Sequence, residues 1–138
     1  MSRRTRSHLF AAVCCVMFWG VGPAFAAELV VDGCRIVDSV GRAIKVAAPF
    51  QRIISLYGAH TENLFALGAA GQIIGVSRNE DWPPQAGRKP VFSYHDDLEK
   101  FLAARPDLVL IRPMVDRGYG RLVRRLEEHG IVVVSLQP

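Results

Sequence analysis

Four short runs of apolar residues, separated by stretches with helical patterning, constrain the fold of this chain most strongly. The runs cover residues 52–56, 72–76, 107–111 and 131–135, and none of them alternates between apolar and polar side chains. Strands without that alternation are buried on both faces, and helices between such strands make them parallel through right-handed crossovers. The sequence therefore predicts an α/β fold, in which a parallel sheet forms the middle of a three-layer lobe.

Helical patterning fills the gaps between these strands. Helices are expected over residues 60–67, 97–104 and 119–129, each with apolar residues on one face. Asp96 is placed to cap the second of them, and Gly130 ends the third.

The segment before the first buried strand has a different texture. Residues 28–47 form short apolar runs joined by turn signals, which predicts a small β-meander that ends at Pro49. Cys34 lies in this segment and is the only cysteine after residue 26, so we expect no internal disulfide. We interpret Cys34 as a small buried hydrophobe rather than a reactive thiol.

The N-terminus has the three parts of a signal peptide. Residues 1–8 are basic, Leu9 to Val21 is an unbroken apolar run, and Ala24 and Ala26 supply small residues at the positions a signal peptidase reads. We expect cleavage after Ala26 and a periplasmic location. An uncleaved membrane anchor is the alternative, because 19 residues from Leu9 to Ala27 carry no charge.

Charge gives no sign of a nucleic-acid partner. The formal net charge is +4, but three arginines lie in residues 1–8, which leaves 14 Lys and Arg against 13 Asp and Glu, or +1, after residue 26. Nucleic-acid binding needs a clustered basic face. We therefore divide the chain into a signal peptide (1–26), an N-terminal β strip (27–50) and an α/β lobe (51–138).

A ligand site is expected at one edge of the predicted sheet. Ligands of open parallel sheets bind beyond the carboxyl ends of the strands, where aromatic, histidine and arginine side chains follow the strands of this chain. Aromatic side chains supply area for stacking and arginines bind anionic groups, so the set suits a rather large, partly apolar ligand with anionic groups. The expected ligand-binding residues are Tyr57, Gly58, His60, Trp82, Tyr94, His95, Arg112 and Met114, and Arg78 lies at the same rim.

Motifs for catalysis are absent from the sequence. It has no G-x-S-x-G elbow, phosphate-binding loop or G-x-G-x-x-G fingerprint, and Ser93 and His95 are too close together to belong to a triad. We expect no enzyme activity, no catalytic residue and no bound cofactor or metal of the protein's own. Two alternatives stay open, a bare metal ion bound by His60, Glu62 and His95, and a secreted α/β enzyme that uses Ser93 or His95.

Several blocks of the sequence resemble one family when they are taken in order. They are RIISLYGAHTENLFALGAAGQIIGV from Arg52, DWPP from Asp81, DLEK from Asp97 and RPDLV from Arg105. Together they are similar to the N-terminal lobe of periplasmic binding proteins for cobalamin and ferric siderophores. The preceding strip, VDSVGR from Val37, resembles the lead-in strands of that family.

The resemblance implies a transport function. Such proteins hold a metal chelate, a corrinoid or an iron complex, in a cleft between two lobes and deliver it to the permease of an ABC importer in the inner membrane. An acidic residue on each lobe docks onto the permease, and the matching position here is Glu99. The cleft positions match Tyr57, Trp82, Tyr94 and Arg112. Contact with the membrane is expected only through the permease or an uncleaved leader.

The sequence departs from this family in length. It stops at Gln137-Pro138, just after the fourth predicted strand, without the joining helix and the second lobe. We therefore expect a lobe that works as half of a clamp, or a truncated fragment that is inactive alone.

Overall fold

The computed structural model describes residues 34–80 and 82–137, all of which lie in one compact unit that spans residues 31–138. The predictions on the signal peptide, its cleavage site and the first strand of the meander fall outside the described residues. Within the described ranges, no helix is long and apolar enough to span a membrane.

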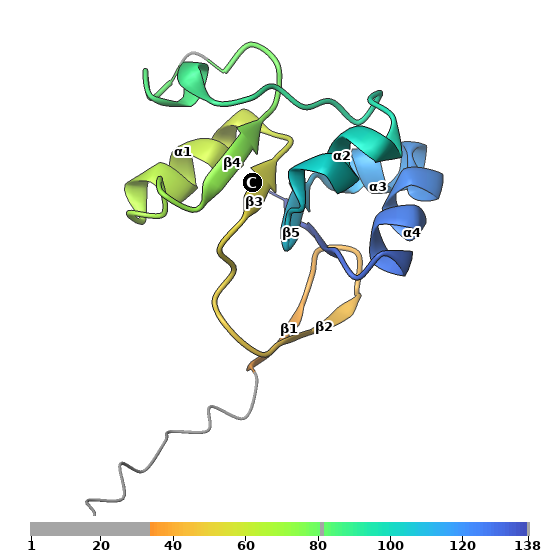
Figure 1. Cartoon of the computed structure of the whole chain (residues 1–138). Helices are drawn as coiled ribbons and strands as arrows, with labels where there is room; N and C mark the ends of the chain where they lie inside the picture. Colours follow the sequence, from red (N-terminus) through yellow and green to blue (C-terminus); the bar gives the residue numbers. More distant parts are fainter. Residues whose placement is uncertain (1–33, 81, 138) are drawn as a thin grey trace, which may run out of the picture. The chain divides into compact units, whose positions relative to one another are not determined.

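Four parallel strands form the central sheet. They are β3 (Ile53–Ser55), β4 (Ile73–Val76), β5 (Leu108–Ile111) and β6 (Val132–Ser135), in the order β4-β3-β5-β6. Figure 1 shows β4, β3 and β5 side by side between groups of helices. The predicted parallel sheet is thereby confirmed, because all three strand pairs are parallel. Each apolar run of the sequence contains one of the strands.

The two faces of the sheet are covered by different elements. One face packs against α2 (Leu98–Ala104), α3 (Pro113–Gly118) and α4 (Gly120–Glu128), and the other packs against α1 (Gly58–Ala66) and the N-terminal hairpin. Alternate residues of one strand point to opposite faces, so a strand buried on both sides must be apolar throughout. The first core includes Ile54, Val109, Ile111, Phe101, Val115 and Leu126, and the second includes Ile53, Leu108, Leu110, Val134, Ile36 and Leu64.

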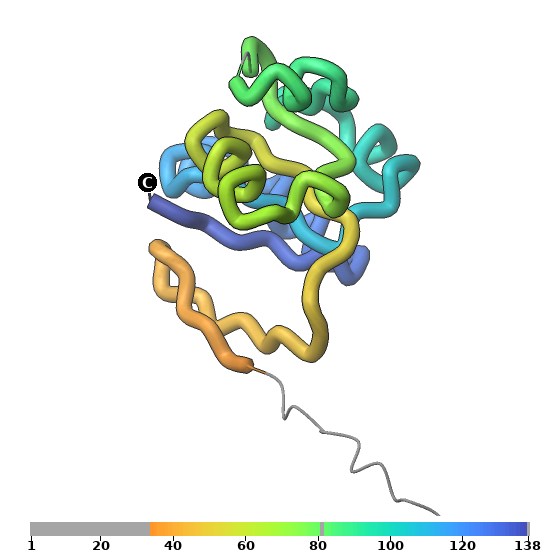
Figure 2. The backbone as a smooth tube through the Cα atoms, turned by 90° about the vertical axis from the view of Figure 1, so that its left-hand side faces the viewer, coloured from red at the N-terminus to blue at the C-terminus, as the bar shows by residue number. Residues whose placement is uncertain are grey.

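An antiparallel hairpin of β1 (Cys34–Val37) and β2 (Ala43–Val46) precedes the sheet. Its turn lies beside β6 (Figure 2), where the Ser39 amide donates a hydrogen bond of 2.8 Å to the Ser135 carbonyl. Gly41 takes a φ of +86°, a conformation that favours glycine, in this turn. The interpretation of Cys34 as buried is wrong, because the thiol lies at the start of β1 and is exposed.

The ends of two helices differ from the prediction. Asp96 does not cap α2, because the residue at its N-cap is Asp97 and the Asp96 carboxylate accepts instead from the Ser93 amide (2.8 Å) and Lys100 Nζ (2.7 Å). The short helix α3 was not predicted, and a 3₁₀ turn, η1 (Ala86–Arg88), lies in the loop after β4. Pro113 at the first position of α3 is the signal that marks it.

Candidate functional site

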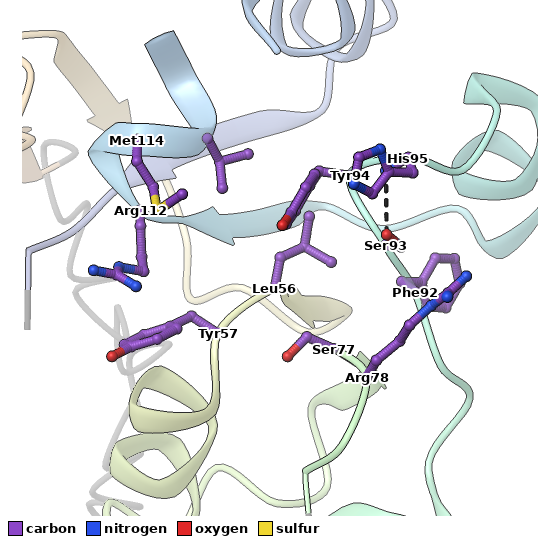
Figure 3. Close-up of a pocket in the computed structure, with 11 residues that line it drawn as sticks. Leu56, Tyr57, Ser77, Arg78, Phe92, Ser93, Tyr94, His95, Arg112 and Met114 are labelled. Carbon is purple, nitrogen blue, oxygen red and sulfur yellow. Dashed lines mark hydrogen bonds between the residues drawn. The ribbon is translucent and has the colours of Figure 1, made fainter. Parts of the chain in front are cut away.

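The carboxyl ends of the strands meet at a pocket of about 350 Å³. Its side chains come from the segments that follow β3, β4 and β5 and from the stretch of chain before α2 (Figure 3). These segments lie far apart in the sequence and converge because all the strands run in the same direction. The lining residues are Leu56, Tyr57, Ser77, Arg78, Phe92, Ser93, Tyr94, His95, Arg112, Met114 and Val115.

Five of the eight predicted ligand-binding residues line this pocket together, namely Tyr57, Tyr94, His95, Arg112 and Met114. Two of the others, Gly58 and Trp82, line an adjoining pocket of about 420 Å³ that shares three residues with the first. Trp82 is 65% exposed in that second pocket. The structure therefore places seven of the predicted residues along one continuous rim.

Tyr57 and Arg112 mark the point where the chain leaves two neighbouring strands in opposite directions. The chain passes from β3 into α1 on one face of the sheet, and from β5 into α3 on the other face. Such a crevice between strands is the usual ligand position in an open α/β sheet. The Arg112 guanidinium lies over the Tyr57 ring, with its carbon 4.4 Å from the ring centre (Figure 3).

An aromatic cluster forms another wall of the pocket. The Tyr94 ring centre lies 4.6 Å from the centres of both His95 and Tyr119, and the Tyr119 hydroxyl is 3.2 Å from His95 Nδ1. These contacts hold the three rings against one another. Tyr94 thus lines the pocket, and Tyr119, at the end of α3, packs against its ring.

Two arginines, Arg78 and Arg112, line the pocket, and its described lining includes no Asp or Glu. Among residues 34–80 and 82–137, no carboxylate lies within ion-pair distance of the Arg78 or Arg112 guanidinium. Arg112 Nε is buried and has no hydrogen-bond partner within the same described ranges. A guanidinium without a partner carboxylate favours an anionic group on a ligand, because its donors form a fork that matches carboxylate or catecholate oxygens.

His60 lies behind the pocket rather than in its lining. It is 4% exposed, and its ring meets the Tyr57 ring edge-on at a centre distance of 5.2 Å. Burial lowers the pKa of His60 below 6.5, and the nearby Arg112 charge lowers it further, while the Leu136 backbone and Glu80 oppose the shift. The placement of His60 therefore gives no support to the prediction that it contacts a ligand directly. Its ring packs against the Tyr57 ring instead.

The floor of the pocket is apolar. Leu56, Phe92 and Val115 form it, and each also belongs to the core beneath the helices. Phe92 lies directly on Gly75 of β4, where any side chain would collide with its ring. The sequence predicts Leu56 as part of a buried strand, but its patterning gives no sign that these three side chains also face a ligand.

Glu99 is exposed in the first turn of α2, as a docking residue must be. Among the residues that the structure describes, no group of three or more His, Cys, Asp or Glu side chains is arranged to hold a metal ion. His60 is buried, whereas His95 is exposed and packs against Tyr94 and Tyr119. The bare-metal alternative gains no support from this arrangement.

Known proteins match the chain over part of its length. An uncharacterised ABC transporter substrate-binding lipoprotein of Bacillus subtilis is 26% identical over 73% of this chain and 32% of the relative. A vitamin B12-binding protein of Vibrio vulnificus is 34% identical over 66% of this chain and 33% of the relative. The chain thus spans about a third of the length of these curated relatives. No protein-family model matches the chain.

The fold gives the same result. The solved structure of a periplasmic heme-binding protein from Pseudomonas aeruginosa superimposes with a TM-score of 0.58, at 27% identity, over 64% of this chain and 32% of that one. The Bacillus relative is named as a lipoprotein and the Pseudomonas protein as periplasmic, which supports an extracytoplasmic location. The predicted resemblance to the N-terminal lobe of periplasmic binding proteins for cobalamin and iron chelates is therefore confirmed, in sequence and in fold.

Proposed function

We propose that this chain is a ligand-binding lobe of the solute-binding component of an ABC importer, and that its ligand is a metal chelate with anionic groups. The observation that carries the proposal is the pocket at the carboxyl ends of β3, β4 and β5, lined by two tyrosines and two arginines. Relatives that are named for binding vitamin B12 and heme support the class of ligand.

The pocket's chemistry favours an anionic chelate over neutral cobalamin. Tyr57 and Tyr94 offer flat surfaces to a corrin, porphyrin or catecholate ring, which all three ligands could use. Arg78 and Arg112 add two cationic forks, which the several carboxylate or catecholate oxygens of an anionic chelate would neutralise more fully than the single phosphodiester of cobalamin. The metal belongs to the ligand, so the protein acts as a binder without catalytic residues or a cofactor of its own.

Export places this lobe where such a ligand arrives. The basic and apolar leader directs the chain to the periplasm, with cleavage after Ala26. Glu99, exposed on α2, contacts the permease in the inner membrane. A single lobe contributes one wall of a cleft, so its affinity alone is weaker than that of a ligand enclosed on both sides.

Calorimetric titration of the purified chain with ferric enterobactin, heme and cyanocobalamin tests the proposal. We expect at least one of the two anionic chelates to bind, and to bind more tightly than cyanocobalamin. Arg112→Gln should weaken that binding by about tenfold, the effect of losing one charge-assisted contact, whereas Arg121→Gln on the outside of α4 is the matched control. Failure of the folded chain to bind any of the three would contradict the proposal.

A further inference from the structure

The helix α3 lines the ligand pocket, and an ion pair joins it to the N-terminal hairpin. We propose that Arg42, the residue just before β2, is a positioning residue for the pocket, because its ion pair with Asp116 fixes α3 in place. This inference rests on the proposed function, and adds that ligand affinity is set partly by a residue that does not line the pocket.

Both ends of α3 contribute to the pocket. Arg112 precedes its first residue, and Met114 and Val115 in its first turn line the pocket directly. Tyr119 follows its last residue and supports Tyr94 and His95 on the other wall. Any shift of α3 would therefore move both walls together.

The helix α3 is too short to be stable on its own. It has six residues, and an isolated helix of that length is not populated in water because nucleation costs more than one turn returns. Two buried side chains, Pro113 and Val115, attach one side of it to the core. Among the side-chain hydrogen bonds and ion pairs of the described residues, α3 makes one, the ion pair from Asp116 to Arg42.

The Arg42 guanidinium is itself held firmly. Nη2 lies 2.6 Å from Asp116 Oδ2 and 3.0 Å from Asp38 Oδ2, and Nη1 lies 3.2 Å from Glu127 Oε1. The Asp38 side chain is fully buried and also accepts hydrogen bonds from three backbone amides. Arg42 is therefore a fixed point on the hairpin, not a mobile surface cation.

The contacts of Arg42 differ in how much they should matter. The Asp116 carboxylate is 19% exposed and its contact is the shortest, whereas the Glu127 carboxylate is 39% exposed. Water screens an exposed pair far more than a partly buried one. Asp116→Asn and Glu127→Gln thus form a matched pair. Each neutralises one carboxylate that contacts the Arg42 guanidinium, but only Asp116 lies on α3, so only the first variant should release that helix.

Hydrogen exchange and ligand titration on the full chain test the inference together. In Asp116→Asn we expect the amides of Val115, Asp116 and Tyr119, which bond within the α3 turn, to exchange about fivefold faster, as for loss of one partly buried ion pair. Affinity for the chelate that the wild type binds, ferric enterobactin or heme, should fall by a similar factor. Glu127→Gln should leave both within about twofold, as for an exposed pair, and Arg42→Lys should fall between the two.

Each result decides the matter. Unchanged α3 exchange in Asp116→Asn would overturn the inference, and so would equal effects of Asp116→Asn and Glu127→Gln. Faster exchange with unchanged affinity would also overturn it, because the helix would then not set the pocket. If the wild type binds neither chelate, the proposed function fails, while the exchange measurement still shows whether Arg42 holds α3.

Discussion

Asp38 is the residue whose removal should destabilise the protein most through polar contacts alone. Its side chain is fully buried, and its two oxygens accept from the amides of Val40 (3.1 Å), Arg42 (2.8 Å) and Ser135 (3.2 Å) and from Arg42 Nε (3.0 Å). Asp38→Ala leaves these donors without their acceptor. The hairpin then loses its side-chain hydrogen bond to the Ser135 amide of β6, while the packing of Ile36 and Ile44 against the core that holds Val134 remains.

The magnitude follows from the burial of each donor. The Ser135 amide bond is fully buried, and a buried donor left without a partner costs about 1–3 kcal/mol. The other donors are partly buried, so water recovers part of their loss. Removing one side of a buried ion pair costs about 3–5 kcal/mol, and we expect a value near the lower end, about 3 kcal/mol. For a compact unit that spans residues 31–138, that lowers Tm by roughly 10–15 °C.

Urea denaturation and calorimetry measure this directly. Glu127→Ala is the control, because Glu127 also contacts Arg42 but is exposed, and its loss should cost about 0.5 kcal/mol or less.

The pH dependence of the Asp38 contribution to stability has a definite sign. Burial by itself would raise the pKa of Asp38, but the hydrogen bonds from Arg42, Ser135 and Val40 outweigh it and hold the pKa below 3.8. Wild type should therefore lose this stability as the pH falls below about 3.8, whereas Asp38→Ala should not. Equal free energies of unfolding for Asp38→Ala and Glu127→Ala at pH 7 would refute the reasoning.

Three further outcomes are expected. Gly75→Ala should cost about 1–3 kcal/mol in thermal unfolding, because its Cβ would lie 2.6 Å from Phe92 Cε2 and 3.3 Å from Ile54 Cγ1; a neutral result would contradict the packing described. The lowered pKa of His60 means that the unfolded chain binds this proton more readily, so stability should decline as the pH falls below about 6.5, and His60→Leu should flatten that part of the Tm profile. Glu99→Gln should leave chelate affinity unchanged but weaken binding to the permease in nanodiscs, and equal permease affinity would remove Glu99 from the docking surface.

The sheet could be predicted from the sequence because its strands are apolar at every position. Val109 and Ile111 face one core while Leu108 and Leu110 face the other, and only a strand in the middle of three layers requires that pattern. Parallel strands in turn place the residues that follow them at one edge, which predicted the convergence of Tyr57 and Arg112.

Other features depend on contacts that no local pattern records. His60 follows β3 closely enough to be assigned to the rim, but α1 begins at Gly58 and its first turn carries the imidazole into a buried position behind Tyr57. The ion pair from Arg42 to Asp116 joins residues 74 positions apart in the chain. Cysteine is a residue type that is often buried, yet Cys34 lies at the end of a two-stranded hairpin and is exposed, because no neighbour among the described residues covers it.

Chemical-shift mapping of the labelled protein tests the central claim most directly. Gallium enterobactin and gallium protoporphyrin are diamagnetic stand-ins for the two anionic iron chelates. With whichever binds, we predict that the amides of Tyr57, Ser77, Tyr94 and Met114, on four separate segments, shift along one titration curve with the same Kd. Shifts confined to one segment, or no shifts with either chelate, would contradict the claim that parallel strand ends assemble a single ligand site.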